Sequence, residues 1–222
     1  MKMTSLILAA SGLLLCAGAQ ADVAVTADLG TTGIGAHLVV PMEKDLNGRF
    51  GINYFSHTTS KMVDTVNFNM KLTLNTYDIL FDYYPTSSPL RVTAGVLYNG
   101  NKVEGQGTPN ATGGYLINGV AFTVNDVGNL KGIVEYRKAS PYLGVGFGNA
   151  LTPNKRWNFS GDLGAILQGR ANTQLAATGC TTSNGVCGVL ATAVAAEKTA
   201  FTNSVNRYSV YPVLRVAVGY NF

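Results

Sequence analysis

Apolar and polar side chains alternate along the last segment of the chain. Every second residue from Val210 to Phe222 is apolar or aromatic, whereas Tyr211, Arg215 and Asn221 fall on the other side. A period of two with one apolar face predicts a β-strand that separates two different media. The aromatic final residue favours a strand that faces lipid and ends at the membrane interface.

Stretches with the same period recur through the chain. They include 32–40, 50–54, 92–98, 131–137 and 157–167. Residues that favour turns separate many of them, as in Tyr84-Pro-Thr-Ser-Ser-Pro-Leu90. We find seven convincing strands, and because single-chain bacterial barrels normally have an even number, we expect about eight.

Two segments are candidates for the eighth strand. Residues 114–124 are the best eighth strand, but Asn118-Gly119 is a strong hairpin-turn signal and also fits a small hairpin within a loop. A strand within 171–185 is the other possibility. The apolar phase also shifts near Asn75–Tyr77, which predicts a β-bulge.

The alternation is interrupted between residues 171 and 207. Leu190, Val194, Phe201 and Val205 recur at roughly helical spacing, which predicts a short helix in this stretch. We expect it to cap or plug the barrel, since Lys198 is its only basic residue and a membrane-surface helix usually carries more. If 114–124 is the eighth strand, this segment lies outside the cell.

The N-terminus predicts export. A basic start at Met1-Lys2, an apolar run from Leu6 to Leu15 and the sequence Ala19-Gln-Ala21 indicate a signal peptide over residues 1–21. Residues 22–222 would then form the barrel. The apolar run is too short for a transmembrane helix, which needs ~20 apolar residues. A lipoprotein signal ending at Cys16 is the alternative, although Leu15 is larger than the residue expected before such a cysteine.

Composition agrees with a membrane barrel. Only 13% of residues are charged, and the chain holds 26 Gly, 11 Tyr and 9 Phe. Apolar and aromatic residues suit a wall that faces lipid, and small residues suit a narrow interior. The expected fold class is therefore all-β, an antiparallel transmembrane β-barrel of about eight strands with a short helix in a long loop. The net charge of +4 is mild, and no basic block suggests nucleic acid.

Two cysteines remain after removal of the signal peptide. Cys180 and Cys187 are joined by a short loop of small polar residues, and an exported chain folds in an oxidising compartment. This predicts a disulfide. A metal site would need two further ligands, and the histidines, His37 and His57, lie far away in sequence.

Several motifs carry a family resemblance. They are Leu80-Phe-Asp-Tyr-Tyr-Pro85, the segment from Thr93 to Lys102, the Pro-Tyr-x-Gly-x-Gly strand within Ser140–Asn149, and the terminal Phe222. Together they resemble the small bacterial outer-membrane proteins of the OmpA- and OmpW-like eight-stranded group. The resemblance implies a place in the bacterial outer membrane, contact with its lipid, and an insertion signal at Tyr220 and Phe222 read by the barrel-assembly machinery. It specifies architecture but not activity, and the long 171–207 segment departs from the simplest members.

An enzymatic site is the sharpest alternative to a passive barrel. Barrel acyl hydrolases need a serine, a histidine and an acidic or amide partner in contact, and here Ser56 and Ser60 lie near His57. His57 is better explained as a loop residue. The glycines of Gly144-Val-Gly-Phe-Gly148 lie inside an alternating strand rather than before a helix, so they do not indicate a dinucleotide site. We expect neither enzymatic activity nor a cofactor.

The interior charges offer the remaining functional signal. If the apolar phase faces lipid, the candidate lumen-lining residues are His37, Arg49, Lys71, Arg91, Glu135, Arg137, Asp162 and Arg215. One interpretation is a narrow channel or binding barrel for a small polar or anionic solute, favoured by the excess of basic residues. The alternative is a structural or surface-interaction barrel whose lumen is packed with paired charges, since eight strands leave room for little beyond their own side chains.

Overall fold

The computed structural model describes residues 23–222 apart from 64–65, 87, 110–113 and 183. The predicted signal peptide lies outside the described residues. Eight antiparallel strands form a barrel, in which β1 and β13 pair and β4 closes the wall against β5. Their bounds are β1 Ala24–Gly30, β2 Gly33–Glu43, β3 Leu46–Val63, β4 Val66–Tyr83, β5 Leu90–Asn99, β10 Ala139–Phe147, β11 Trp157–Leu167 and β13 Val210–Asn221.

The strands continue beyond the barrel at one end only. β3 and β4 are 18 residues each, which corresponds to about 60 Å of strand. Residues 76–83 of β4 pair with β5 in the barrel, whereas residues 66–73 of β4 pair with β6. From β6 the sheet continues through β9 to β12. We call this part the extension. It comprises 55–63 of β3, 66–73 of β4, β6 Lys102–Pro109, β7 Tyr115–Ile117, β8 Val120–Phe122, α2 Val124–Val127, β9 Asn129–Glu135, β12 Asn172–Thr178, α3 Asn184–Val205 and the 3-10 turn Asn206–Tyr208.

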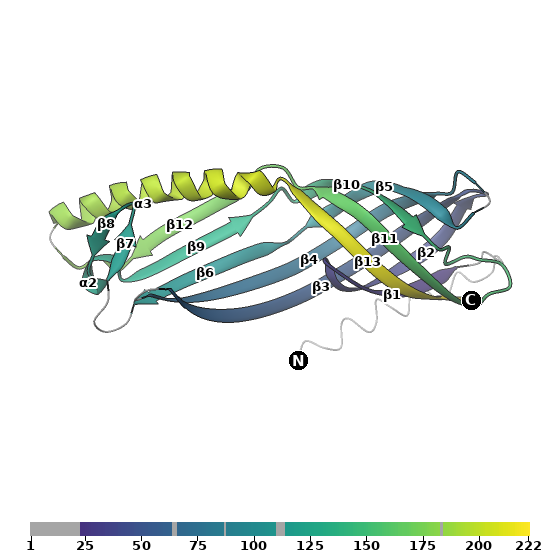
Figure 1. Cartoon of the computed structure of the whole chain (residues 1–222), viewed down its shortest axis with the longest axis horizontal. Coiled ribbons are helices and arrows are strands. Elements are labelled where there is room, and N and C mark those ends of the chain that lie inside the picture. Colours follow the sequence, from purple (N-terminus) through teal and green to yellow (C-terminus); the bar gives the residue numbers. More distant parts are fainter. Residues whose placement is uncertain (1–22, 64–65, 87, 110–113, 183) are drawn as a thin grey trace, which may run out of the picture.

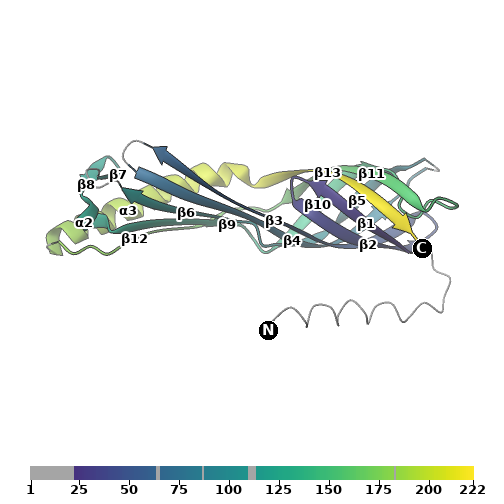
Figure 2. The ribbon, with the colours of Figure 1, turned by 90° about the horizontal axis from the view of Figure 1, so that it is seen from below.

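Figure 1 shows the barrel at one end of an elongated molecule and the extension at the other, with α3 lying along the sheet next to β12. The view in Figure 2 shows α3 on one face of this sheet rather than at its edge. An apolar cluster joins the helix to the β7–β8 hairpin and to α2. Its buried members are Tyr115, Ile117, Phe122, Val127, Leu190, Ala193 and Val194.

The strand that completes the barrel differs from the expected one. The eighth strand is β1, whereas residues 114–124 form the small hairpin β7–β8, with Asn118 and Gly119 at its turn and both at positive φ. Residues 131–137, predicted as a strand, fall largely in β9, which belongs to the extension. The stretch 171–185 does contain a strand, β12, but it lies outside the barrel wall. The predicted helix is present as α3, and at 22 residues it is longer than expected.

No bulge occurs near Asn75–Tyr77, so that prediction is wrong. The register of β3 and β4 runs without a shift from the pair Leu46–Tyr83 to the pair Val63–Val66. What changes at this point is the surroundings. Within the barrel, β4 turns Ile79 and Phe81 outward to lipid and buries Asp78 inward, but farther along, the same inward face carries Leu74 and Leu72.

The polarity of the two faces therefore inverts where the barrel ends. Inside the membrane the outward face is apolar and the inward face polar; in the extension the outward face of β4 carries Lys71 and Thr73. Aromatic rings mark both borders of the lipid-facing band, as in known barrels. Tyr77 and Tyr98 pack together at one border, with ring centroids 6.0 Å apart, and Trp157 packs on Tyr220 at the other, 5.1 Å apart.

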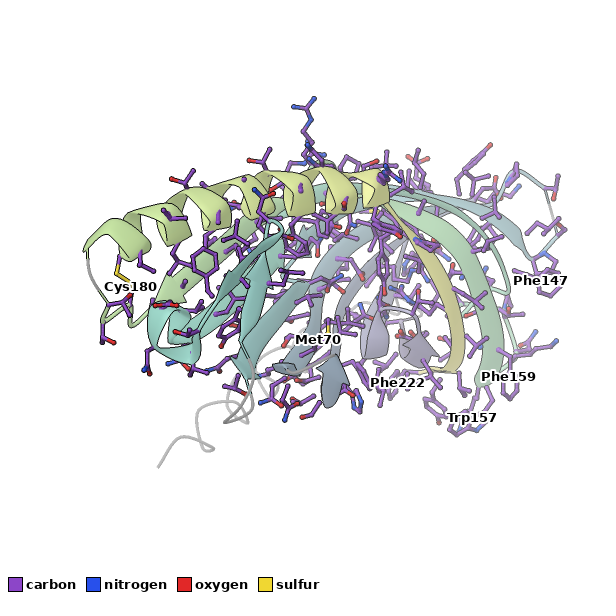
Figure 3. The ribbon with its side chains drawn as sticks, turned by 60° about the vertical axis from the view of Figure 1, so that its left-hand side comes forward. Met70, Phe147, Trp157, Phe159, Cys180 and Phe222 are labelled. Carbon is purple, nitrogen blue, oxygen red and sulfur yellow. A yellow bond between two sulfur atoms is a disulfide. The ribbon has the colours of Figure 1, made fainter. Side chains whose placement is uncertain are left out.

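Figure 3 shows Trp157, Phe159 and Phe222 gathered at the end of the barrel away from the extension. The ring of Phe222 meets that of Tyr220 edge-on at 5.1 Å. None of the helices in the described ranges combines the length and the hydropathy needed to cross a membrane.

Candidate functional site

The barrel lumen brings together five of the eight residues that the sequence proposed for it. His37, Arg49, Arg91, Asp162 and Arg215 point inward, and each is at most 4% exposed. Their strands place them there because each lies in phase with other inward residues and out of phase with the lipid-facing apolar ones.

One group of charges lies toward the end of the lumen away from the extension. Asp162 receives hydrogen bonds from Arg49 Nη1 at 2.9 Å and from Arg91 Nη2 at 2.7 Å. Asp82 receives one from Arg49 Nη2 at 3.2 Å and another from the Thr93 hydroxyl at 2.6 Å. Two guanidiniums thus face two carboxylates, an arrangement that neutralises charge locally.

A second group lies closer to the extension and centres on His37. The ring nitrogens lie between two carboxylates, with Nδ1 2.7 Å from Asp28 and Nε2 3.0 Å from Asp78. Arg215 contacts the same two carboxylates, at 3.3 and 3.5 Å, and Asn53 donates to Asp78 at 3.1 Å. Arg215 Nη1 also lies 3.2 Å from His37 Nε2, so the imidazole, the guanidinium and the two carboxylates form one buried group.

Glycines provide the space for this network. A Cβ at Gly51 would overlap the His37 ring, and one at Gly146 would lie 2.7 Å from Arg91 Nε and 2.8 Å from an Asp162 oxygen. The glycine runs noted in the sequence therefore make room for large charged side chains in a narrow interior.

Apolar side chains pack beside the charges. One cluster is formed by Leu80, Leu97, Tyr142, Ile166 and Val213, and on the inward face of β4 its Leu80 lies between Asp78 and Asp82. At the other end, Ala150 and Leu151, which follow β10, pack against Ala24 and Val39. A cavity lined in part by Arg49 and Arg91 has a volume of about 10 Å³, which is room for no more than about one water molecule.

The structure does not bring Lys71, Glu135 and Arg137 into the lumen. Arg137 is exposed beyond the end of β9 and donates to the Leu167 carbonyl at 3.2 Å. Glu135 lies in the extension, 3.7 Å from Lys138. Lys71 and Glu135 lie on strands in which apolar and polar residues alternate as in the barrel, but these parts of the strands belong to the extension.

Another group of charged side chains lies outside the barrel, on the outward face of the extension. Glu104 lies 2.9 Å from Lys102 and 3.9 Å from Lys131, while Lys102 also approaches Glu135 at 4.0 Å. The hydrogen bond from Lys102 holds the pKa of the Glu104 carboxyl below its ordinary value, with Lys71 among the cations that contribute. These side chains are 27 to 57% exposed, so solvent screens them.

Three inward carboxylates were missed by sequence reasoning. Asp78 and Asp82 alternate with Ile79 and Phe81, and this local pattern could have identified them. Asp28 lies in β1 between the outward apolar residues Ala27 and Leu29, in a stretch that was not predicted to be a strand. Without these three residues the lumen appeared more basic than it is.

The predicted disulfide between Cys180 and Cys187 is confirmed. It links the segment after β12 to the first turn of α3. The suggested Ser–His arrangement does not form. His57 lies on β3 with its ring stacked near Phe55, whereas Ser60 is three positions away on the opposite face and donates to Asn69.

Comparison with known proteins supports the architecture. No protein-family model matches the chain, and no curated protein matches it. The crystal structure of CarO2 from Acinetobacter baumannii aligns with a TM-score of 0.59 at 21% identity, over 92% of this chain and all of that one. The crystal structure of CarO from the same organism aligns with a TM-score of 0.57 at 26% identity, over 90% and 97% of the two chains. The chain thus has the fold of the small outer-membrane eight-stranded barrels.

Proposed function

We propose that this protein is a closed outer-membrane barrel that anchors the extension at the bacterial cell surface, where the extension carries the interactions. The observation that supports this most is the lumen. Four carboxylates, three guanidiniums and His37 contact one another there, and two clusters of buried apolar side chains pack beside them. Buried charges matched in this way hold the barrel together and leave little room for a solute.

The connections between strands indicate the orientation. At the end away from the extension, strands are joined by short segments at 44–45, 84–89 and 148–156. At the other end, residues 100–138 and 168–209 build most of the extension. Outer-membrane barrels have short periplasmic turns and longer extracellular loops, so the extension would face the outside. The signal peptide at 1–21 would direct export, and Tyr220 and Phe222 would serve insertion by the barrel-assembly machinery into outer-membrane lipid.

A narrow channel or a solute-binding lumen is the second candidate. It was suggested by an excess of basic residues, but Asp28, Asp78 and Asp82 offset that excess once they are placed inside. The Ser–His arrangement considered for a lipid-modifying enzyme finds no support here, since His57 and Ser60 lie on opposite faces of β3.

Planar-bilayer recording of the refolded protein separates the two candidates. Folding is first verified by the heat-dependent shift in gel mobility that folded barrels show. A closed lumen predicts no reproducible current steps from the folded protein. Discrete steps whose ion selectivity changes in the Arg91→Gln/Arg215→Gln variant would instead support a channel.

A further inference from the structure

The inward face of the extension is hollow as well as apolar. One cavity of about 290 Å³ lies between the sheet, the β7–β8 hairpin and α3, and a neighbouring one of about 260 Å³ lies toward the barrel mouth. Val103 and Val134 line both of them, so the two are parts of one groove. Together they fall in the size range of small-molecule sites, ~300–1,000 Å³.

Two glycines open the floor of this groove. Gly105 on β6 and Gly132 on β9 are paired in register, and both face α3. A Cβ at Gly105 would meet no described atom within 4 Å, and one at Gly132 would make an ordinary contact with Leu175 at 3.7 Å. The space above them is therefore not filled by neighbouring side chains.

The groove is accessible to solvent although its walls are apolar. Met70 and Leu72 on β4 remain 43% and 37% exposed. Figure 3 shows Met70 on β4, in the part of the sheet beneath α3. Exposed apolar side chains on a concave surface favour an apolar occupant.

A polar group marks the end of the groove near the barrel. Asn101 is 7% exposed, and its Oδ1 accepts the backbone N–H of Asn75 at 3.0 Å, but its Nδ2 has no hydrogen-bond partner among the described residues. Gln168 beside it is satisfied, since its Nε2 donates to the Tyr208 carbonyl at 2.7 Å. An unpaired buried donor is unfavourable, so a ligand oxygen that accepts from Asn101 would be stabilised.

The far end of the groove has the opposite character. Glu197 on α3 lines the cavity there and accepts the backbone N–H of Asn118 at 3.0 Å. Its carboxylate disfavours an anionic group nearby. The two ends together orient a ligand that carries an acceptor on one end only.

We propose that this groove binds a free medium-chain carboxylate from the surrounding medium, with its carboxylate on Asn101 Nδ2 and its alkyl chain over Gly105 and Gly132. The inference goes beyond the anchoring role and does not depend on whether the lumen conducts. Alkyl burial supplies most of the affinity, and the Asn101 hydrogen bond sets the direction of binding.

The test uses the complete mature protein in lipid nanodiscs, labelled with ¹³C at the methionine methyl groups and titrated with decanoate. We expect the Met70 methyl resonance to shift along a saturable curve. Met42 provides an internal control because it lies on β2 at the other end of the barrel and is 50% exposed. Equal, unsaturable shifts of both methyl groups would mean partitioning into lipid and would overturn the proposal.

Matched variants locate the ligand. Gly105→Leu fills the groove and should abolish the saturable Met70 shift, whereas Gln106→Leu places the same side chain on the outward face of the same strand and should leave it unchanged. Asn101→Asp keeps the acceptor for Asn75 but replaces the donor with a carboxylate, and should weaken decanoate binding by about tenfold or more. Binding that is unaffected by Gly105→Leu, or decylamine binding as tightly as decanoate, would refute the site or its orientation.

Discussion

The paired charges of the lumen make a quantitative prediction at Asp162. The Asp162→Asn variant keeps the shape of the side chain but removes the negative charge that Arg49 and Arg91 share. The side chain of Asp162 is 1% exposed and accepts hydrogen bonds from these arginines at 2.7 to 3.4 Å. Arg91 still donates to the Gly148 carbonyl, but the two arginines then share a single carboxylate, Asp82, at 3.2 Å from Arg49 and 3.6 Å from Arg91.

Removing one partner of a buried ion pair typically costs about 3–5 kcal/mol. We expect Asp162→Asn to lower the free energy of unfolding by this amount. The charge-balanced variant Arg49→Met/Asp162→Asn should recover part of the loss, because it leaves Arg91 facing Asp82 without an excess cation. At the exposed ion group of the extension, Glu104→Gln should cost below about 1 kcal/mol.

Urea unfolding in lipid vesicles, followed by tryptophan fluorescence, measures these differences. The chain has one tryptophan, Trp157, and it lies in the lipid-facing aromatic border. Its emission therefore reports loss of the membrane environment. A cost for Asp162→Asn no larger than that for Glu104→Gln would refute the reasoning, because it would mean that water screens the lumen charges as it screens those at the surface.

Three further predictions follow from the same structure. Gly51→Ala places a methyl group against the His37 ring and should lower the yield of heat-modifiable barrel, whereas Gly105→Ala, in open space, should not; equal yields would contradict the packing described for the lumen. Cys187→Ser removes a cross-link that closes a short loop, worth at most about 2.5 kcal/mol, and should speed proteolysis near the start of α3 while the barrel stays heat-modifiable; an unchanged cleavage rate would contradict a local role. Deletion of Phe222, which is 72% exposed and meets Tyr220 edge-on, should reduce outer-membrane levels in cells but leave refolding in vitro intact. Normal cellular levels would count against its part in insertion.

The sequence predicted the barrel well where one strand face meets lipid along its whole length. The segments of β5, β11 and β13 alternate without interruption, and each lies in the wall as expected. β1 was missed because it is short and directly follows the predicted cleavage site, although Val25 and Leu29 alternate with Asp28 as the pattern requires.

The prediction near Asn75 failed for a different physical reason. A period-two pattern reveals which residues share a face, but it does not tell whether that face meets lipid, water or a protein core. β4 passes from lipid to water without a break in register, so its apolar residues change faces where its surroundings change. The same limit misplaced Lys71 and Glu135, whose strands had already left the membrane.

The pairing of the lumen charges could not be read from the sequence. Asp162 meets Arg49 and Arg91 across 113 and 71 residues of chain, and these contacts depend on strand registers that only the closed barrel fixes. The groove of the extension was also beyond reach, since it requires Gly105 and Gly132 to be paired beneath a helix from a later segment.

Cysteine labelling of intact cells tests most directly whether the barrel anchors the extension outside. A single cysteine is introduced at Gln106, on the outward face of the extension, or at Thr86, in the turn after β4, each in the protein that keeps its disulfide. A maleimide reagent that does not cross the outer membrane should label the Gln106→Cys protein in intact cells and the Thr86→Cys protein only after the membrane is broken. Labelling of Thr86→Cys but not of Gln106→Cys in intact cells would contradict the account.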